Sequence, residues 1–235
     1  MAKKLGVIGG LGPVATAYFY ELVSRMTEAE NDQEHLDINI ISKPSIPDRT
    51  DYILGRSAKS PLPYLIEIGK VLEELGSDYI AMPCITAHYF YNELTDSLNI
   101  PIINIISETA KYLKRHNISY AGIMATEGTI QSLLFQHELE KEGINPIIPS
   151  EHSQSLVTSL IYDNVKAGKP VDMNRFAVIK DELIRKGSDI IILGCTELSM
   201  INRDENIGQG FVDALEILAM CSVIRCGARL KQEYT

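Results

Sequence analysis

One pattern occurs twice in this chain of 235 residues and constrains its fold more than any other feature. Residues 76–86 read Gly-Ser-Asp-Tyr-Ile-Ala-Met-Pro-Cys-Ile-Thr, and residues 187–196 read Gly-Ser-Asp-Ile-Ile-Ile-Leu-Gly-Cys-Thr. In both copies, a short apolar run separates the glycine from a cysteine eight positions later. An apolar run of this length after a helix-ending glycine is typical of a strand buried on both faces of a parallel sheet. The pattern therefore predicts two equivalent strands, each ending in a cysteine.

A second match supports duplication of the chain. Residues 122–130 align with residues 6–14, in the same order relative to the cysteine strands. Predicted strands alternate with helices of 10–15 residues, which indicates an α/β fold. We predict two pseudo-symmetric lobes, each a parallel sheet flanked by helices, with the active site in the cleft between them. The N-terminal lobe would comprise residues 1–117 plus 207–235 and carry Cys84, and residues 118–206 would form the second lobe with Cys195.

Three segments give more specific expectations. Residues 43–63 are polar and rich in proline, and we expect a long surface loop of the kind that often acts as a lid. Residues 101–105 are expected to form a fourth strand of the first lobe. We also expect one continuous helix over residues 128–142 and a final helix over residues 211–228.

Charge and composition exclude several classes of partner. The net charge of −9 and the pI near 5.1 argue against nucleic acid or an anionic membrane surface. No run of 18 apolar residues and no signal-peptide layout is present, so we expect a cytoplasmic protein without a membrane span. The cysteine spacing matches no zinc site, so we predict no metal and four free thiols, of which two are packing residues of the last helix, Cys221 and Cys226.

The other two cysteines, Cys84 and Cys195, could be core residues, since free cysteine is among the most buried residue types. Their equivalent places at strand carboxyl ends, where open α/β sheets bind ligands, favour a function. Two thiols on opposite sides of one carbon can remove a proton from one face and deliver a proton to the other, which inverts a stereocentre without a cofactor. The helix after each strand would help by stabilising an anion at its N-terminus.

Six motifs occur in order along the chain. They are Gly-Val-Ile-Gly-Gly-Leu-Gly-Pro-Val-Ala-Thr at 6–16, Ile-Pro-Asp-Arg-Thr at 46–50, Pro-Cys-Ile-Thr-Ala-His at 83–88, Ala-Thr-Glu-Gly-Thr at 125–129, Ile-Tyr-Asp-Asn-Val-Lys-Ala-Gly at 161–168 and Leu-Gly-Cys-Thr-Glu-Leu at 193–198. Together they resemble the cofactor-independent aspartate/glutamate racemase superfamily, and within it the aspartate racemase branch. The resemblance extends over nearly the whole chain and implies two lobes, no cofactor, a small amino-acid substrate and, often, a homodimer. It also implies that Cys84 and Cys195 are the acid/base thiols, with Cys195 deprotonating the L isomer and Cys84 the D isomer.

The resemblance also assigns two cations. It makes Arg49 the partner of the substrate's side-chain carboxylate, which a guanidinium can bind through two hydrogen bonds, and Lys166 the second cation. Without the resemblance, Arg49 would be interpreted as a solvated surface residue and Lys166 as the end of a helix. One position departs from the family pattern, because Ile85 stands where relatives commonly have an asparagine that helps to hold the substrate. This departure leaves room for a broader range of amino acids.

The remaining candidates surround the two cysteines. Gly10 lies in a Gly-Gly-Leu-Gly-Pro turn that lacks the dinucleotide-binding order and lets the backbone approach a small ligand. Glu197 follows the second Cys-Thr pair as a substrate-site candidate or a helix-terminal charge, and His88 is expected to pack or cap rather than transfer protons. Four threonines could hold the α-carboxylate and its developing charge, or cap helices: Thr86, Thr126, Thr129 and Thr196.

We therefore predict a pyridoxal-phosphate-independent aspartate racemase that works by two-thiol 1,1-proton transfer. A broad-specificity or glutamate racemase is the main alternative, with a hydantoin racemase or a decarboxylase further off. The two cysteines favour racemisation over the single-cysteine chemistry of a decarboxylase. An alternative of another class is a catalytically silent amino-acid-binding protein.

Overall fold

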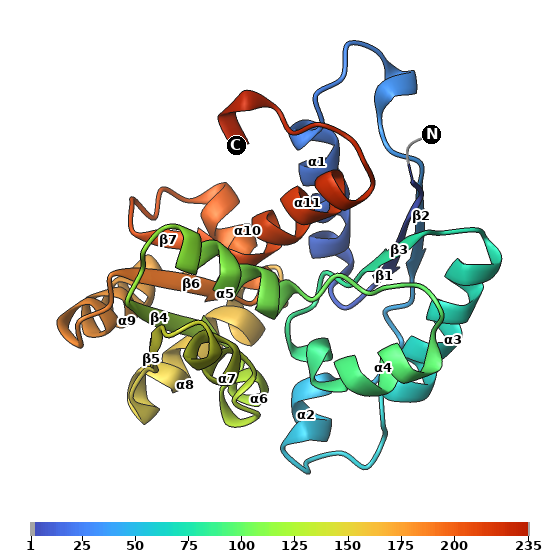
Figure 1. The fold of residues 1–235 in the computed structure, drawn as a ribbon. Coiled ribbons are helices and arrows are strands. Elements are labelled where there is room, and N and C mark those ends of the chain that lie inside the picture. Colours follow the sequence, from blue (N-terminus) through green and yellow to red (C-terminus); the bar gives the residue numbers. More distant parts are fainter. Residues whose placement is uncertain (1–2, 235) are drawn as a thin grey trace.

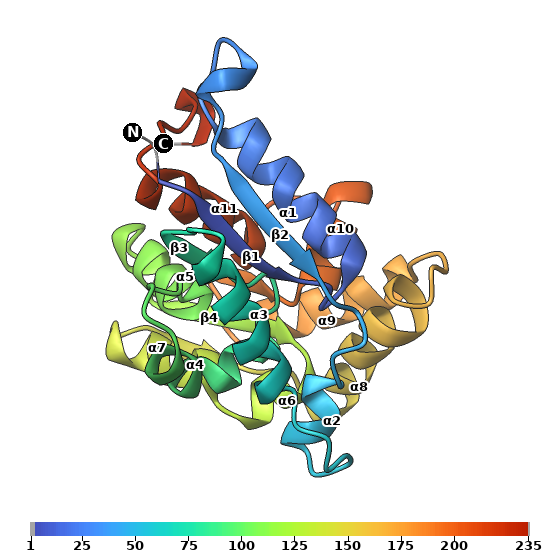
Figure 2. The same ribbon diagram turned by 90° about the vertical axis from the view of Figure 1, so that its right-hand side faces the viewer.

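Two parallel β-sheets flanked by helices make up the protein (Figures 1 and 2). The computed structural model describes residues 3–234. The strand order is β2-β1-β3 in the first sheet and β5-β4-β6-β7 in the second. The predicted fold class is confirmed.

The first half of the chain contains β1 (Leu5–Gly9), α1 (Pro13–Met26), η1 (Asp32–Glu34), β2 (Ile38–Ser42), α2 (Arg49–Ile53), α3 (Leu62–Glu74), β3 (Tyr79–Ala81), η2 (Thr86–Phe90), α4 (Tyr91–Ser97) and α5 (Ile105–Arg115). The second half contains β4 (Tyr120–Ala125), α6 (Glu127–Gln131), α7 (Leu134–Lys141), β5 (Asn145–Ile147), α8 (Glu151–Ser159), η3 (Leu160–Val165), α9 (Met173–Arg185), β6 (Ile190–Gly194), α10 (Thr196–Asp204), β7 (Phe211–Asp213), α11 (Ala214–Arg225) and η4 (Gln232–Tyr234).

The repeated Gly-Ser-Asp motif has the same structural role in both lobes. Gly76 and Gly187 adopt positive φ values of 75° and 97° directly after α3 and α9, a backbone conformation that glycine tolerates best. The aspartate that follows each serine then accepts backbone N–H bonds at the neighbouring central strand: Asp78 from Lys4 at 2.7 Å, and Asp189 from Tyr120 at 2.8 Å. The motif therefore ends a helix and ties the cysteine strand to the centre of its sheet.

Helix α11 connects the two lobes. It packs against α1 and α5, and Figure 1 shows it beside α1 between the two sheets. The largest apolar core, which includes Phe19, Phe135 and Leu218, extends through this region from one sheet to the other. Because this core is shared, both cysteine strands are held in one packed unit.

Four expectations differ from the structure. The final helix begins only at Ala214, because residues 211–213 form β7, which pairs with β6. The expected strand at 101–105 is reduced to a single bridge between Ile80 and Ile102, because α5 begins at Ile105. The helix expected over 128–142 is broken where Leu133 has a φ of 58°.

The fourth difference concerns residues 43–63, which are not simply a surface loop. They contain α2, and they bury Ile46, Arg49 and Thr50. Helix α2 packs against α6 of the other lobe, where Thr50 lies so close to Gly128 that a Cβ on the glycine would stand 3.0 Å from the Cα of Thr50. This proline-rich segment therefore closes one side of the space between the lobes.

Candidate active site

Both repeated cysteines line one small cavity between the lobes. Cys84 follows β3 in a tight turn, in which its N–H donates to the carbonyl oxygen of Met82 at 2.7 Å. Cys195 follows β6 directly and is the N-cap residue of α10. The cavity has a volume of about 10 Å³, which is room for about one water molecule. The described conformation is therefore closed, and an amino acid would enter only if the cavity widens.

Cys195 has an acidic neighbour. Its Sγ–H donates to Oε2 of Glu197 at 2.9 Å, and both side chains are buried. Burial and the negative charge of Glu197 together raise the pKa of the Cys195 thiol well above its usual value. We expected the N-terminus of α10 to favour a thiolate, but these two effects favour the protonated thiol instead.

Cys84 has a basic neighbour. The guanidinium of Arg49, which is only 8% exposed, lies beside the Cys84 thiol and donates to the carbonyl oxygens of Pro47 at 3.1 Å and Leu11 at 3.4 Å. Burial alone would lower the pKa of Arg49, but Cys84 and Asp48 raise it. The Nε of Arg49 is buried and has no hydrogen-bond partner among residues 3–234. This buried cation, which lines the cavity, therefore has one unsatisfied donor.

Lys166 connects the two lobes at the edge of the cavity. Its Nζ stands 3.7 Å from Oε1 of Glu197 and 4.0 Å from Oδ2 of Asp48, and it lies 4.5 Å from the centre of the Tyr162 ring. Burial would lower its pKa, whereas Glu197 and Cys195 raise it, so the ammonium stays charged. Lys166 follows a π-helical turn, η3, a feature that is frequent at functional sites.

Sequence reasoning missed some of the residues that line the cavity. Burial raises the pKa of the Tyr162 phenol, which hydrogen-bonds Thr50, and Asp48 caps α2. Asp48 and Thr50 flank Arg49 in its motif, and Tyr162 precedes Lys166 by four positions, so adjacency within the motifs was the available signal. The missed lining residues are Leu11, Asp48, Thr50 and Tyr162.

Three threonine hydroxyls form a closed ring between the lobes. Thr86 lies 2.9 Å from Thr126 and 3.0 Å from Thr129, and the last two lie 3.0 Å apart. Thr126 also accepts the backbone N–H of Thr129 and so caps α6. Thr86, Thr126 and also Thr196 line the cavity, whereas Thr129 is fully buried behind it. Thr129 therefore holds the other two hydroxyls and does not face the cavity in this closed conformation.

A larger chamber of about 690 Å³ adjoins the cavity. The two share wall residues that include Arg49, Lys166 and Glu197, whereas Gly10 belongs only to the chamber. A Cβ on Gly10 would stand 2.4 Å from the backbone nitrogen of Lys43, so this glycine permits a close approach of two backbone segments. Ile85 is buried and lines the cavity itself.

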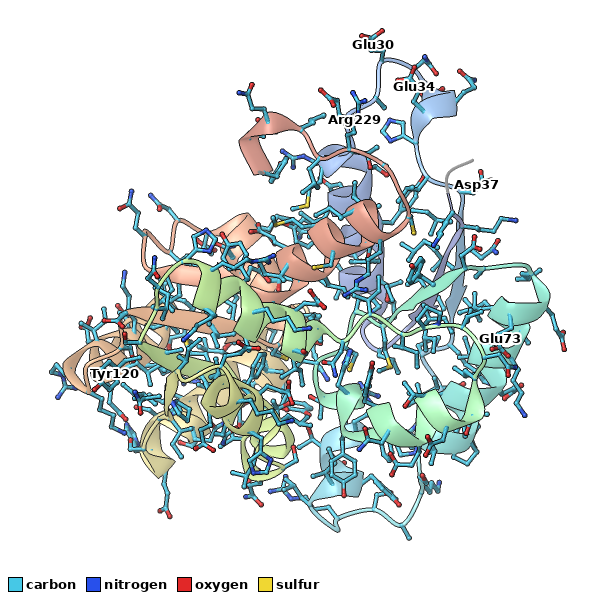
Figure 3. The ribbon with its side chains drawn as sticks, viewed as in Figure 1. Glu30, Glu34, Asp37, Glu73, Tyr120 and Arg229 are labelled. Atoms are coloured by element: carbon cyan, nitrogen blue, oxygen red, sulfur yellow. The ribbon has the colours of Figure 1, made fainter. Side chains whose placement is uncertain are left out.

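The acidic excess of the chain lies partly on its outer surface. Figure 3 shows Glu30 and Glu34 at the outer tip of the first lobe and Asp37 below them, and all three are exposed. Within residues 3–234, no group of three or more metal-binding side chains comes together. In the same range, no helix has the length and apolar character needed to cross a membrane. At the cavity itself, by contrast, two cations face two anions, since its lining includes Arg49 and Lys166 as well as Asp48 and Glu197.

Comparison with known proteins identifies the family. The model of the Asp/Glu/hydantoin racemase family matches residues 8–221, which is most of the chain. The chain belongs to this racemase family. The broad specificity amino-acid racemase RacX of Bacillus subtilis is 31% identical over 204 residues, covering 84% of this chain and 86% of that protein.

Solved structures of this racemase family show the same two-lobed architecture. The aspartate racemase of Picrophilus torridus superposes with a TM-score of 0.86 at 31% identity, covering 99% of this chain and 97% of that one. The glutamate racemase of Francisella tularensis in complex with D-glutamate has a TM-score of 0.68 at 18% identity, covering 95% and 81%. At 18% identity, the similarity to the glutamate racemase concerns the fold alone.

Proposed function

We propose that the protein is an aspartate racemase that uses no cofactor and moves protons with two thiols. The observation that carries the proposal is that Cys84 and Cys195, from equivalent strand ends of the two lobes, line one cavity with opposite charges beside them. Arg49 places a positive charge beside Cys84, where it would offset the charge of a thiolate formed during the reaction, and Glu197 favours the protonated thiol of Cys195. The two thiols are therefore suited to opposite roles, Cys84 as the base and Cys195 as the acid.

The reaction follows from this asymmetry. The Cys84 thiolate removes the Cα proton from one face of the substrate, and the charge left behind spreads into the α-carboxylate. The Cys195 thiol then delivers its proton to the opposite face, which leaves Cys84 as a thiol and Cys195 as a thiolate. The hydroxyls of Thr86 and Thr126 are positioned to donate to the developing charge once the ring of threonines opens. By the family resemblance, the site with Cys84 as the base accepts the D isomer first.

Arg49 supports an acidic substrate. Its unpaired Nε is a buried donor beside Cys84, and a guanidinium binds a carboxylate more specifically than an ammonium does. Lys166 adds a second positive charge at the wall that the cavity shares with the chamber. Aspartate carries two carboxylates, so it complements both cations.

One observation favours a second candidate, a broad-specificity racemase. Ile85 offers the substrate a buried apolar side chain where relatives commonly offer an amide. The similarity to the Bacillus subtilis racemase is consistent with this alternative. A glutamate racemase would require the same two thiols and room for one more methylene group.

Proton NMR in D2O, without added cofactor, distinguishes these functions. Single enantiomers of aspartate, glutamate, alanine and other amino acids are incubated with the protein. Loss of the Cα proton signal with formation of the other enantiomer, fastest for aspartate, is the expected result. Exchange restricted to non-acidic amino acids would favour the broad-specificity candidate. Binding without any exchange would instead indicate a silent amino-acid-binding protein.

We further propose that the protein is cytoplasmic and forms a homodimer. Analytical ultracentrifugation at micromolar concentrations tests the homodimer. A monomer at all concentrations would contradict the dimer.

A further inference from the structure

His88 contacts the backbone of Cys84 from outside the cavity. The imidazole is 3% exposed, and its Nδ1 stands 3.0 Å from the carbonyl oxygen of Cys84. On the other side of the ring, Nε2 stands 3.4 Å from the backbone nitrogen of Ile105, the first residue of α5. The imidazole therefore joins the turn that carries Cys84 to the start of another helix.

The two partners assign the tautomer of His88. A carbonyl oxygen only accepts, so Nδ1 carries the proton and donates to Cys84, while Nε2 accepts the N–H of Ile105. The carbonyl oxygen of Ile103, at 3.5 Å from Nε2, is farther away. Burial lowers the pKa of His88 to about 4, so the ring is neutral at pH 7, as these bonds require. Both nitrogens are occupied, which leaves no proton for exchange with a substrate.

The bond from His88 restrains the backbone that carries the Cys84 side chain. The Cys84 carbonyl fixes the plane of the following peptide, and that peptide is trans, so the Ile85 N–H points away from His88. Cys84 and Ile85 both line the cavity. Because the turn is also held by the 2.7 Å bond to Met82, little freedom remains for the direction of the Cα–Cβ bond of Cys84.

We propose that His88 is a positioning residue for Cys84: its Nδ1–H holds the Cys84 carbonyl, and thereby the thiol, in line with the substrate carbon. The inference rests on the proposed role of Cys84 as an acid/base thiol. A misplacement of the reacting atoms by 1 Å can lower a rate about 100-fold, so a backbone hydrogen bond at this turn is sufficient to matter.

Two amide variants separate the two ring nitrogens. Asparagine places an N–H close to the position of Nδ1, whereas glutamine places one close to Nε2. We expect His88→Gln to lower kcat about 100-fold with little change in KM, and His88→Asn to keep most of the wild-type kcat. Tyr91→Phe is the matched control, because it removes the nearby bond from the Tyr91 hydroxyl to the Ile102 carbonyl oxygen at 3.3 Å and should leave kcat unchanged.

Equal losses of kcat in folded His88→Asn and His88→Gln would overturn the proposal, as would full activity in both. If His88→Gln does not fold, His88→Asn decides alone: retained kcat supports the proposal, and a loss in the folded variant overturns it. Iodoacetamide labelling separates this question from the proposed function. The alkylation rate of Cys84, divided by that of Cys195, should be lower in His88→Gln than in the wild-type protein and should return to the wild-type value in His88→Asn. This result is expected even if the wild-type protein racemises nothing. An unchanged ratio in an active racemase would contradict the positioning role.

Discussion

Replacing Glu197 by glutamine should make Cys195 easier to ionise. Glu197 accepts the thiol proton of Cys195 at 2.9 Å, and both residues are only 5% exposed, so solvent screens this interaction little. The substitution keeps the shape of the side chain and removes its negative charge. Lys166, 3.7 Å from the Glu197 carboxylate and 4.0 Å from Asp48, then acts on the thiolate with one neighbouring anion fewer. Both changes favour the thiolate.

The size of the effect follows from the hydrogen bond. A bond to a charged group contributes about 1.5–3 kcal/mol, which corresponds to a fall in the pKa of Cys195 of about one to two pH units. Burial remains in the variant, so the pKa should stay above the usual value for cysteine. Below that pKa, the thiolate fraction, and with it the alkylation rate, should rise about 10- to 100-fold.

The assay is iodoacetamide labelling as a function of pH, with each cysteine quantified by peptide mass spectrometry. The chain contains its own control, because Cys221 donates to Glu108 at 3.6 Å, and burial, with Glu108, raises the pKa of Cys221 to about 12. Glu108→Gln should speed labelling of Cys221 and leave Cys195 unchanged. If Cys195 is not labelled faster in Glu197→Gln than in the wild-type protein, the assigned role of Glu197 is refuted.

Three further perturbations test other parts of the site. Cys84→Ser and Cys195→Ser should each slow racemisation by about 10²- to 10⁴-fold in a polarimetric assay, because a hydroxyl is a far weaker acid and base; wild-type rates in both would end the two-thiol mechanism. Arg49→Ala should raise KM for aspartate much more than for alanine, and equal effects would remove Arg49 from side-chain recognition. Gly128→Ala should lower kcat, because the new Cβ, 3.0 Å from Thr50 Cα, holds α2 away from α6. An unchanged kcat would show that this close contact is not required.

The sequence predicted the parts of the molecule that local patterns determine. The apolar runs before Cys84 and Cys195 are buried strands because helices flank the two sheets to which they belong, and the Gly-Ser-Asp motif in front of them forms a helix end and a strand anchor. The duplication accounts for the equivalent orders β2-β1-β3 and β5-β4-β6 in the two sheets, although neither order was predicted. The meeting of the two thiols in one cavity was predictable from the duplication.

Contacts between the lobes were not predictable from local patterns. Arg49 lies in a polar, proline-rich segment and is buried only because α2 packs on α6 of the other lobe. Thr129 was one of the candidate ligands of the substrate, but its hydroxyl hydrogen-bonds Thr86 of the first lobe and Thr126 of the second. Glu197 acquired its role from the side chain of Cys195 two positions earlier, which depends on rotamers rather than on sequence spacing.

The central claim is that two bases act on opposite faces of one carbon, and early deuterium incorporation tests it most directly. Protiated L-aspartate is incubated with the protein in D2O, and both enantiomers are isolated after a few per cent of conversion. With two bases, the D-aspartate formed carries deuterium at Cα, while the remaining L-aspartate keeps its proton. Equal deuterium in both enantiomers at the earliest times would mean that a single base serves both faces, and would contradict the account.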